Sequence, residues 1–204
     1  MINRYKLHPW HGIEPGLKAP EQVTVFIEIV PTDTVKYEID KTSGYLTIDR
    51  PQKFSNVVPS LYGFIPQTYC GDLIAAYDAK KAGRTVGKGD GDPLDICVLS
   101  ERAISNGDIL LQAIPIGGLR LFDKGEADDK IIAILKDDEV YASYTDINHV
   151  PDSIINRLKH YFLTYKNIPG LEISPIEIVG VFNKKEAHKV IKKSMKDYQL
   201  KFGE

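Results

Sequence analysis

The sequence has little cysteine, no long apolar run and almost no excess charge, and each shortage excludes a class of protein. Cys70 and Cys97 are the only cysteines among 204 residues, so we expect reduced intracellular thiols and no disulfide scaffold. No apolar run approaches the length of a membrane span, and the opening MINRYKLHPWHGI has no apolar signal core. The sequence therefore predicts a cytoplasmic protein with no membrane partner.

The charges are nearly balanced. The chain has 26 lysines and arginines against 28 aspartates and glutamates, a net charge of -2, which gives no general reason to expect nucleic acid as a partner. Any function that depends on charge must then come from local clusters. With 43% hydrophobic residues the chain can build one sizeable core, and we expect a single domain over residues 1–204.

Short apolar segments separated by turn residues predict a mainly β fold. Residues 35–50 read as a hairpin around a Ser43-Gly44 turn, and strands are expected in DICVLS, DILLQAIPI and KIIAILK. Such a series favours a closed or nearly closed antiparallel barrel. In VTVFIEIV, Glu28 lies on one face of a strand, and the other face carries four apolar residues: Val23, Val25, Ile27 and Ile29.

Two helices are expected late in the chain. Apolar residues recur at helical spacing in PDSIINRLKHYFLTYK and in NKKEAHKVIKKSMKDYQLKF. Asn183, with Glu186 three residues later, resembles a capping box at the start of the second helix. The polar, glycine-rich segment 79–89, AKKAGRTVGKG, is typical of an exposed loop.

Three aspartates crowd the segment GKGDGDPLDICVL. Each like-charged pair costs ~4 kcal/mol at ~4 Å and an effective dielectric of ~20, so a cation should lie among Asp90, Asp92 and Asp95. Hard carboxylate oxygens suit Mg²⁺ or Mn²⁺ better than Zn²⁺. The simpler interpretation, a solvated turn, stays open. A second acidic run, FDKGEADDK, is also explained by a solvated turn, although Asp128 and Lys130 would project to the same side of a strand.

Two other motifs do not fit the aspartate segment. An EF-hand loop starting at Asp90 would have Leu94 at its fifth position and Asp95 where glycine is required. GRTVGKGD lacks the first glycine of a phosphate-binding Walker loop and the Ser or Thr after its lysine.

The segment GDGDPLDICVL resembles the D-x-D-P-x-D signature of the family I soluble inorganic pyrophosphatases. The resemblance runs from about residue 23 to residue 166, because further family segments occur in the same order: FIEIV, KYEID, TIDR, LYGFIPQT, FDKGEADDK and HYFLTYK. It implies a five-stranded OB-like antiparallel β-barrel flanked by two or more helices. It also implies Mg²⁺-dependent hydrolysis of pyrophosphate, with Mn²⁺ as a substitute, by direct attack of a metal-bridged water.

The resemblance also implies a role for each matching residue. Asp92 corresponds to the general base, while Glu28 and Glu38 correspond to outer acidic groups. The implied metal ligands are Asp90, Asp95, Asp123 and Asp128. The implied phosphate-binding residues are Lys36, Arg50, Tyr62, Lys130, Tyr165 and Lys166.

The sequence departs from the commoner family pattern at three places. Val58 stands where a tyrosine is frequent, and Lys124 stands where an acid is frequent. Residues 72–88 form a longer segment than compact members have, which we interpret as a surface insertion. A homo-oligomer is expected, but this insertion can block or rebuild the usual hexameric packing.

Two alternative functions remain. A barrel of this kind also serves as a noncatalytic nucleic-acid-binding module, although the acidic loops argue against a basic groove with stacking aromatics. The same carboxylates could instead support a metal-dependent phosphodiesterase. Phosphate release from pyrophosphate separates both alternatives from the leading hypothesis.

Overall fold

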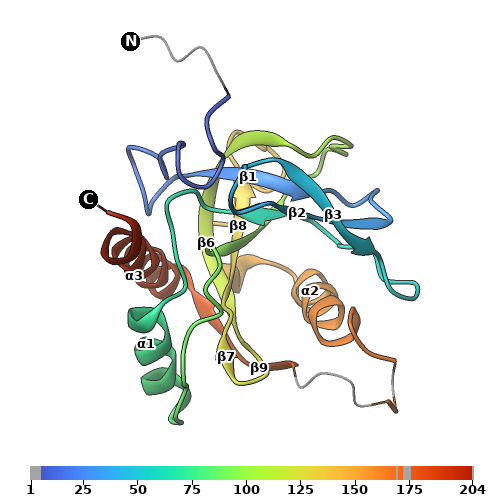
Figure 1. Ribbon diagram of the computed structural model, residues 1–204. Coiled ribbons are helices and arrows are strands. Elements are labelled where there is room, and N and C mark those ends of the chain that lie inside the picture. Colours follow the sequence, from blue (N-terminus) through green and yellow to red (C-terminus); the bar gives the residue numbers. More distant parts are fainter. Residues whose placement is uncertain (1–5, 169, 172–175, 204) are drawn as a thin grey trace.

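Five strands form a closed ring at the centre of the protein (Figure 1). The computed structural model describes residues 6–168, 170–171 and 176–203. The ring follows the order β1 (Val23–Ile29), β4 (Leu61–Phe64), β5 (Asp95–Leu99), β8 (Lys130–Leu135) and β6 (Ile109–Asp123), and β6 closes it against β1. The expected five-stranded barrel-like sheet is therefore present.

One pair in this ring is parallel, which corrects the expectation of a wholly antiparallel barrel. Ile96 of β5 lies opposite Ile131 of β8 in parallel register, whereas the other four ring pairs are antiparallel. The reason is topological. Strand directions that alternate around a ring can match at closure only if the number of strands is even, so an odd ring must contain a parallel pair.

Short strands extend the ring along β6, and a separate hairpin packs beside β1. The expected hairpin forms a separate two-stranded sheet from β2 (Val35–Ile39) and β3 (Leu46–Pro51), with Gly44 in the left-handed region at φ +75°. The long strand β6 continues past the ring, where it pairs with β7 (Glu126–Ala127) and β9 (Ile176–Asn183).

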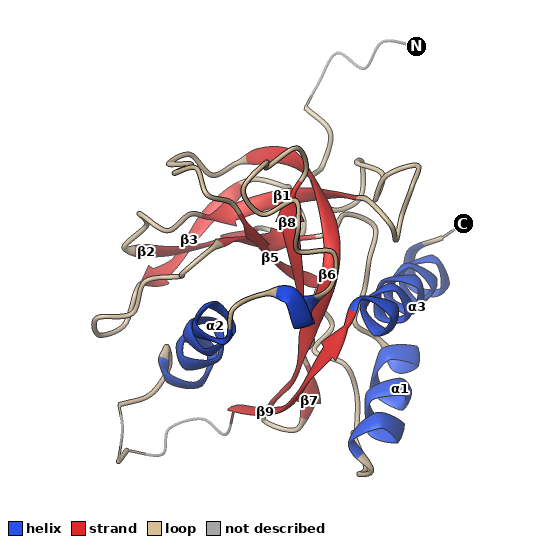
Figure 2. Cartoon of the chain, turned by 180° about the vertical axis from the view of Figure 1, so that it is seen from behind, coloured by secondary structure: helices blue, strands red, loops and turns tan. Residues whose placement is uncertain are grey.

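Helices flank the sheet on two sides. Both predicted helices form, as α2 (Asp152–Thr164) and α3 (Lys184–Phe202), and a short 3-10 turn, η1 (Ile147–His149), precedes α2. Figures 1 and 2 show α1 (Asp72–Ala82) beside α3 on one flank and α2 on the other. Among the described helices, none has the length and apolar content needed to cross a membrane.

Helix α1 corrects the predicted loop over residues 79–89, because its last four residues, 79–82, are helical. Its first turn is capped by Asp197 of α3, whose carboxylate accepts hydrogen bonds from the backbone N–H groups of Gly71 and Ile74 at 3.1 and 3.0 Å. Ile74 is fully buried, so this part of residues 72–88 contributes to the core. That residues 72–88 are an insertion stays a prediction.

The predicted alternation of β1 holds only in its first part. Val23, Val25 and Ile27 enter one apolar cluster, whereas Ile29 enters a second cluster that includes α2. The register against β4 shifts between Ile27 and Ile29, as in a β-bulge, and this turns Ile29 to a different side.

A buried arginine joins the sheet to the flank formed by α1 and α3. The Arg120 guanidinium of β6 contacts carboxylates of Asp78 at 3.1 Å, Asp129 at 3.3 Å and Glu186 at 3.5 Å. Asn183 caps α3 as predicted by accepting a hydrogen bond from the Glu186 N–H at 3.1 Å, but the Glu186 side chain pairs with Arg120. Burial raises the pKa of Asp78 to about 6, even though Arg120 opposes the rise.

The Arg120→Met variant should lose ~3–5 kcal/mol of unfolding free energy, because it leaves three buried carboxylates without their shared cation. Urea unfolding followed by circular dichroism measures this. Lys88→Met is the matched control, since it breaks an exposed pair with Glu126 and should cost under ~1 kcal/mol. Equal losses in both variants would contradict the structural role given to Arg120.

Candidate active site

The aspartate segment is fixed to the protein and is not a solvated turn. Backbone hydrogen bonds run from the Cys70 N–H to the Asp92 carbonyl at 2.8 Å and from the Gly91 N–H to the Cys70 carbonyl at 3.1 Å. Gly89 packs so closely that a Cβ there would lie 2.1 Å from the Cys70 carbonyl oxygen. The backbone therefore holds the three aspartates near one another.

The centre of the site is an ammonium group between two carboxylates. Lys130 Nζ contacts both Asp95 and Asp128, and the Tyr62 hydroxyl donates to Asp95 Oδ2 at 2.5 Å. The parallel β5–β8 register explains the first contact, because Ile96 opposite Ile131 places Asp95 beside Lys130. Asp128 and Lys130 project to the same side, as the strand period predicts, while Asp129 points to Arg120.

Asp90 adds a third carboxylate to this centre. Burial raises the pKa of Asp90 well above its usual range, and the nearby Asp128 raises it further. Burial also raises the pKa of Asp128, against the effect of Lys130. A hydrogen bond between the two side chains also raises the pKa of Asp90 and lowers the pKa of Asp128. The centre therefore has more potential negative charge than its one ammonium can balance.

A small cavity of about 70 Å³ opens beside this centre. Burial raises the pKa of Glu28 to about 8, although Glu28 Oε1 accepts a hydrogen bond from the Ile39 N–H at 2.8 Å. Asp95 and Glu38 raise it further by repulsion. The charged and phenolic residues that line the cavity are Glu28, Lys36, Tyr37, Glu38, Lys41, Tyr62, Asp92 and Asp95.

The β2–β3 hairpin supplies the cationic rim of the cavity. Lys36 Nζ contacts Glu38 Oε2 at 2.7 Å and Asp49 Oδ2 at 2.8 Å, and Arg50 also pairs with Asp49. Burial alone would lower the pKa of Lys36, but its hydrogen bonds to Asp49 and Glu38 raise it overall. Lys36 thus joins Glu38 to Asp49, and Asp49 joins Lys36 to Arg50.

The end of α2 provides a further group of predicted residues. Tyr165 follows the last residue of α2, and Lys166 pairs with Asp123 at the end of β6. Lys166 also lowers the pKa of Asp49, although less than Lys36 does and against the effect of burial. All thirteen predicted residues therefore lie in one connected set: the Lys130 centre, the cavity, the hairpin rim and the end of α2.

Two residues of this set were not predicted. Lys41, in the hairpin turn, pairs with Asp92, and Asp49 joins Lys36 to Arg50. Asp49 lies in the quoted segment TIDR, and its place next to Arg50 was the available signal. Nothing local marks Lys41, because its partner is 51 residues away.

The two departures from the family pattern lie in different environments. Val58 is fully buried in the apolar cluster that includes α2, so it offers no polar group. Lys124 is exposed in the turn between β6 and β7, at φ +53°.

The donor set suits a hard divalent cation. Within the described ranges, no three carboxylate, imidazole or thiol groups already converge as the ligands of one ion. At the centre, the Lys130 ammonium lies between Asp95 and Asp128. The buried carboxylates of this centre offer only oxygen atoms, which are the ligands that Mg²⁺ and Mn²⁺ prefer. Among them are Asp90 and Asp128, whose pKa values are raised. These residues therefore fit such an ion.

Comparison with known proteins gives one consistent family. The family model described as inorganic pyrophosphatase matches residues 25–199. An inorganic pyrophosphatase of Chlamydia muridarum is 54% identical over 196 residues, which cover 94% of each chain. The soluble inorganic pyrophosphatase 2 of Chlamydomonas reinhardtii is 38% identical over 192 residues, which cover 94% of this chain and 88% of that one.

Solved structures agree. The inorganic pyrophosphatase of Thermus thermophilus superposes with a TM-score of 0.78 at 27% identity, over 95% of this chain and 99% of that one. The Helicobacter pylori inorganic pyrophosphatase superposes with a TM-score of 0.75 at 31% identity, over 92% of this chain and 98% of that one. The resemblance seen in the sequence motifs is confirmed, and the chain belongs to the inorganic pyrophosphatase family.

Proposed function

We propose that the protein hydrolyses inorganic pyrophosphate to two orthophosphates with Mg²⁺ as its cofactor. The observation that supports this best is the juxtaposition of opposite charges. Buried carboxylates around Lys130 adjoin the hairpin rim with Lys36 and Arg50, and Lys166 adds a cation from the end of α2. Carboxylates bind divalent cations and the rim binds phosphate oxygens, so the pair suits a metal–phosphoanhydride substrate.

The carboxylates would hold the metal in two groups. Asp90, Asp95 and Asp128 would bind the most tightly held ion, and Asp123 would join Asp128 in binding ions that arrive with the substrate. Glu28 and Glu38 would act from the cavity wall, partly through water. Bound Mg²⁺ lowers the pKa of water and offsets charge on the phosphates. Mn²⁺, with similar ligand preferences, would substitute.

Asp92 would act as the general base. Its side chain lines the cavity, is 38% exposed, and pairs with Lys41, while its backbone N–H donates to Asp90 Oδ1 at 3.0 Å. An attacking water forms the new P–O bond, the bridging P–O bond breaks, and Asp92 accepts the proton that water loses. The proton then passes to a product phosphate.

The phosphate groups would be held by cations and phenols. Arg50 can bind two oxygens with its planar fork, whereas Lys36, Lys130 and Lys166 act as point charges. Tyr62 and Tyr165 add hydroxyl donors. These groups offset charge that develops on the leaving phosphate. A cytoplasmic location and a homo-oligomeric state stay predictions from the sequence.

Orthophosphate release from pyrophosphate tests the proposal. With Mg²⁺ the purified protein should release two orthophosphates for each pyrophosphate, and excess chelator should abolish turnover until Mg²⁺ is restored. A phosphodiester such as bis-p-nitrophenyl phosphate should not be hydrolysed. Hydrolysis of the diester alone would support the phosphodiesterase alternative. Salt-dependent binding of single-stranded nucleic acid without phosphate release would support the binding module.

The Asp92→Asn variant should keep its fold and lose ~10²–10⁴-fold in kcat, because the amide has no free carboxylate to take the proton. Steady-state kinetics at saturating Mg²⁺ measures this. Asp137→Asn is the control, since that carboxylate is 80% exposed and pairs with Lys136. An Asp92→Asn kcat within a factor of two of the wild type would remove Asp92 from the role of base.

A further inference from the structure

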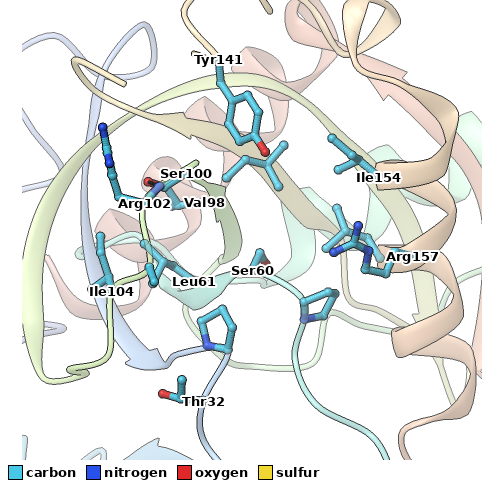
Figure 3. Close-up of a pocket in the computed structure, with 15 residues that line it drawn as sticks. Thr32, Ser60, Leu61, Val98, Ser100, Arg102, Ile104, Tyr141, Ile154 and Arg157 are labelled. Atoms are coloured by element: carbon cyan, nitrogen blue, oxygen red, sulfur yellow. Dashed lines mark hydrogen bonds between the residues drawn. The ribbon is translucent and has the colours of Figure 1, made fainter. Parts of the chain in front are cut away.

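A second pocket lies away from the proposed active site, between α2 and the ends of β4 and β5 (Figure 3). Its volume is about 190 Å³, and it shares no lining residue with the cavity at Glu28. Leu61 and Val98 line it from the sheet, and Ile154 from α2. The reaction proposed above uses none of its side chains.

The pocket is held in shape by a buried carboxylate. Asp138 accepts hydrogen bonds from the Glu101 N–H at 2.8 Å and the Tyr141 N–H at 3.0 Å, so it ties together two loops that line the pocket. Burial raises the pKa of Asp138, but these bonds more than offset the rise and lower it overall. The loop after β5 and the loop that carries Tyr141 are therefore held together at this side of the pocket.

One arginine that lines this pocket, Arg157, has no carboxylate partner among the described residues. Figure 3 shows Arg157 reaching from α2 toward the cavity, with the Tyr141 hydroxyl pointing in from another side. Within the described part of the chain, Arg157 has neither an ion pair nor a hydrogen-bond partner for its guanidinium. Arg102 lies at the rim, where it pairs with Glu101. The lining residues include no Asp or Glu.

The remaining walls are mostly apolar, and the volume limits what fits. Pro59, Leu61, Ile104 and Leu158 give surfaces suited to a hydrocarbon body. An engineered cavity of ~150 Å³ holds benzene, so about 190 Å³ accommodates one ring-sized body with a small polar group. A guanidinium favours a phosphate or carboxylate as that group.

We propose that this pocket binds a small organic anion, a ring-sized apolar body carrying one phosphate or carboxylate that pairs with Arg157. The apolar body lies against Leu61, Val98 and Leu158, and the Tyr141 hydroxyl donates to the anion. The site is separate from the proposed catalytic residues, so its occupancy does not depend on the proposed hydrolysis.

Calorimetric titration of the chelated full-length protein tests this, with phenyl phosphate and benzoate as the two probes. At least one probe should bind at one site per chain, and inorganic phosphate, which lacks the apolar body, should bind at least tenfold more weakly. Arg157→Met should weaken binding at least ~10-fold, because a hydrogen bond to a charged group is lost. Ala103→Phe, which fills an exposed wall of the pocket, should also abolish binding.

Lys159→Met is the matched control, since it removes one positive charge from α2 outside the pocket and should leave affinity unchanged. Equal loss of probe affinity in Lys159→Met and Arg157→Met would overturn the proposal. So would binding of inorganic phosphate and of benzylamine, a cationic ring compound, as tightly as the two anionic probes. So would failure of both probes to bind the wild type. Dissociation of an oligomer by Arg157→Met, with no probe binding, would instead identify a contact between copies.

Discussion

The Lys130 ammonium between two buried carboxylates is the interaction on which the rest of the site depends. Asp95, Asp128 and Asp90 carry more potential negative charge than one lysine can balance, and burial raises the pKa of Asp90 well above its usual range. Because the fold confines these carboxylates, their mutual repulsion favours the binding of further cations. Burial likewise raises the pKa of Glu28, in the wall of the adjoining cavity, to about 8, and repulsion from Asp95 adds to the rise.

The closed ring of five strands explains how Lys130 comes to lie beside Asp95. Because five strands cannot alternate all the way around, one neighbouring pair must run parallel, and in this fold that pair is β5 and β8. The first residues of these two strands, Asp95 and Lys130, therefore lie at the same end of the sheet. Tyr62 on β4 reaches Asp95 from the next strand. The hairpin lines the cavity together with Asp95, and the end of α2 brings Lys166 to Asp123. Topology therefore places the cations next to the acids.

Local patterns in the sequence predict the elements whose causes are local. The hairpin turn at Gly44, the cap at Asn183 and the crowded aspartates were all readable, because glycine freedom, capping and charge repulsion act over a few residues. Contacts between distant segments were not readable. α1 is capped by Asp197, which lies over a hundred residues away, and the parallel pair follows from closure of the whole ring. The sequence alone does not show that the predicted acidic and basic side chains come together in space. It also gives no local sign that Lys41 pairs with Asp92.

Proton release on Mg²⁺ binding shows whether carboxylates of the metal-free site hold protons that the ion displaces. The chelated protein would be titrated with Mg²⁺ at pH 7 by calorimetry in two buffers that differ in ionisation enthalpy. We expect binding to release protons, since carboxylates with raised pKa values, such as Glu28 at about 8, must ionise when the cation arrives. We also expect much weaker binding in Asp95→Asn. Mg²⁺ binding without proton release, and with equal affinity in Asp95→Asn, would contradict the account.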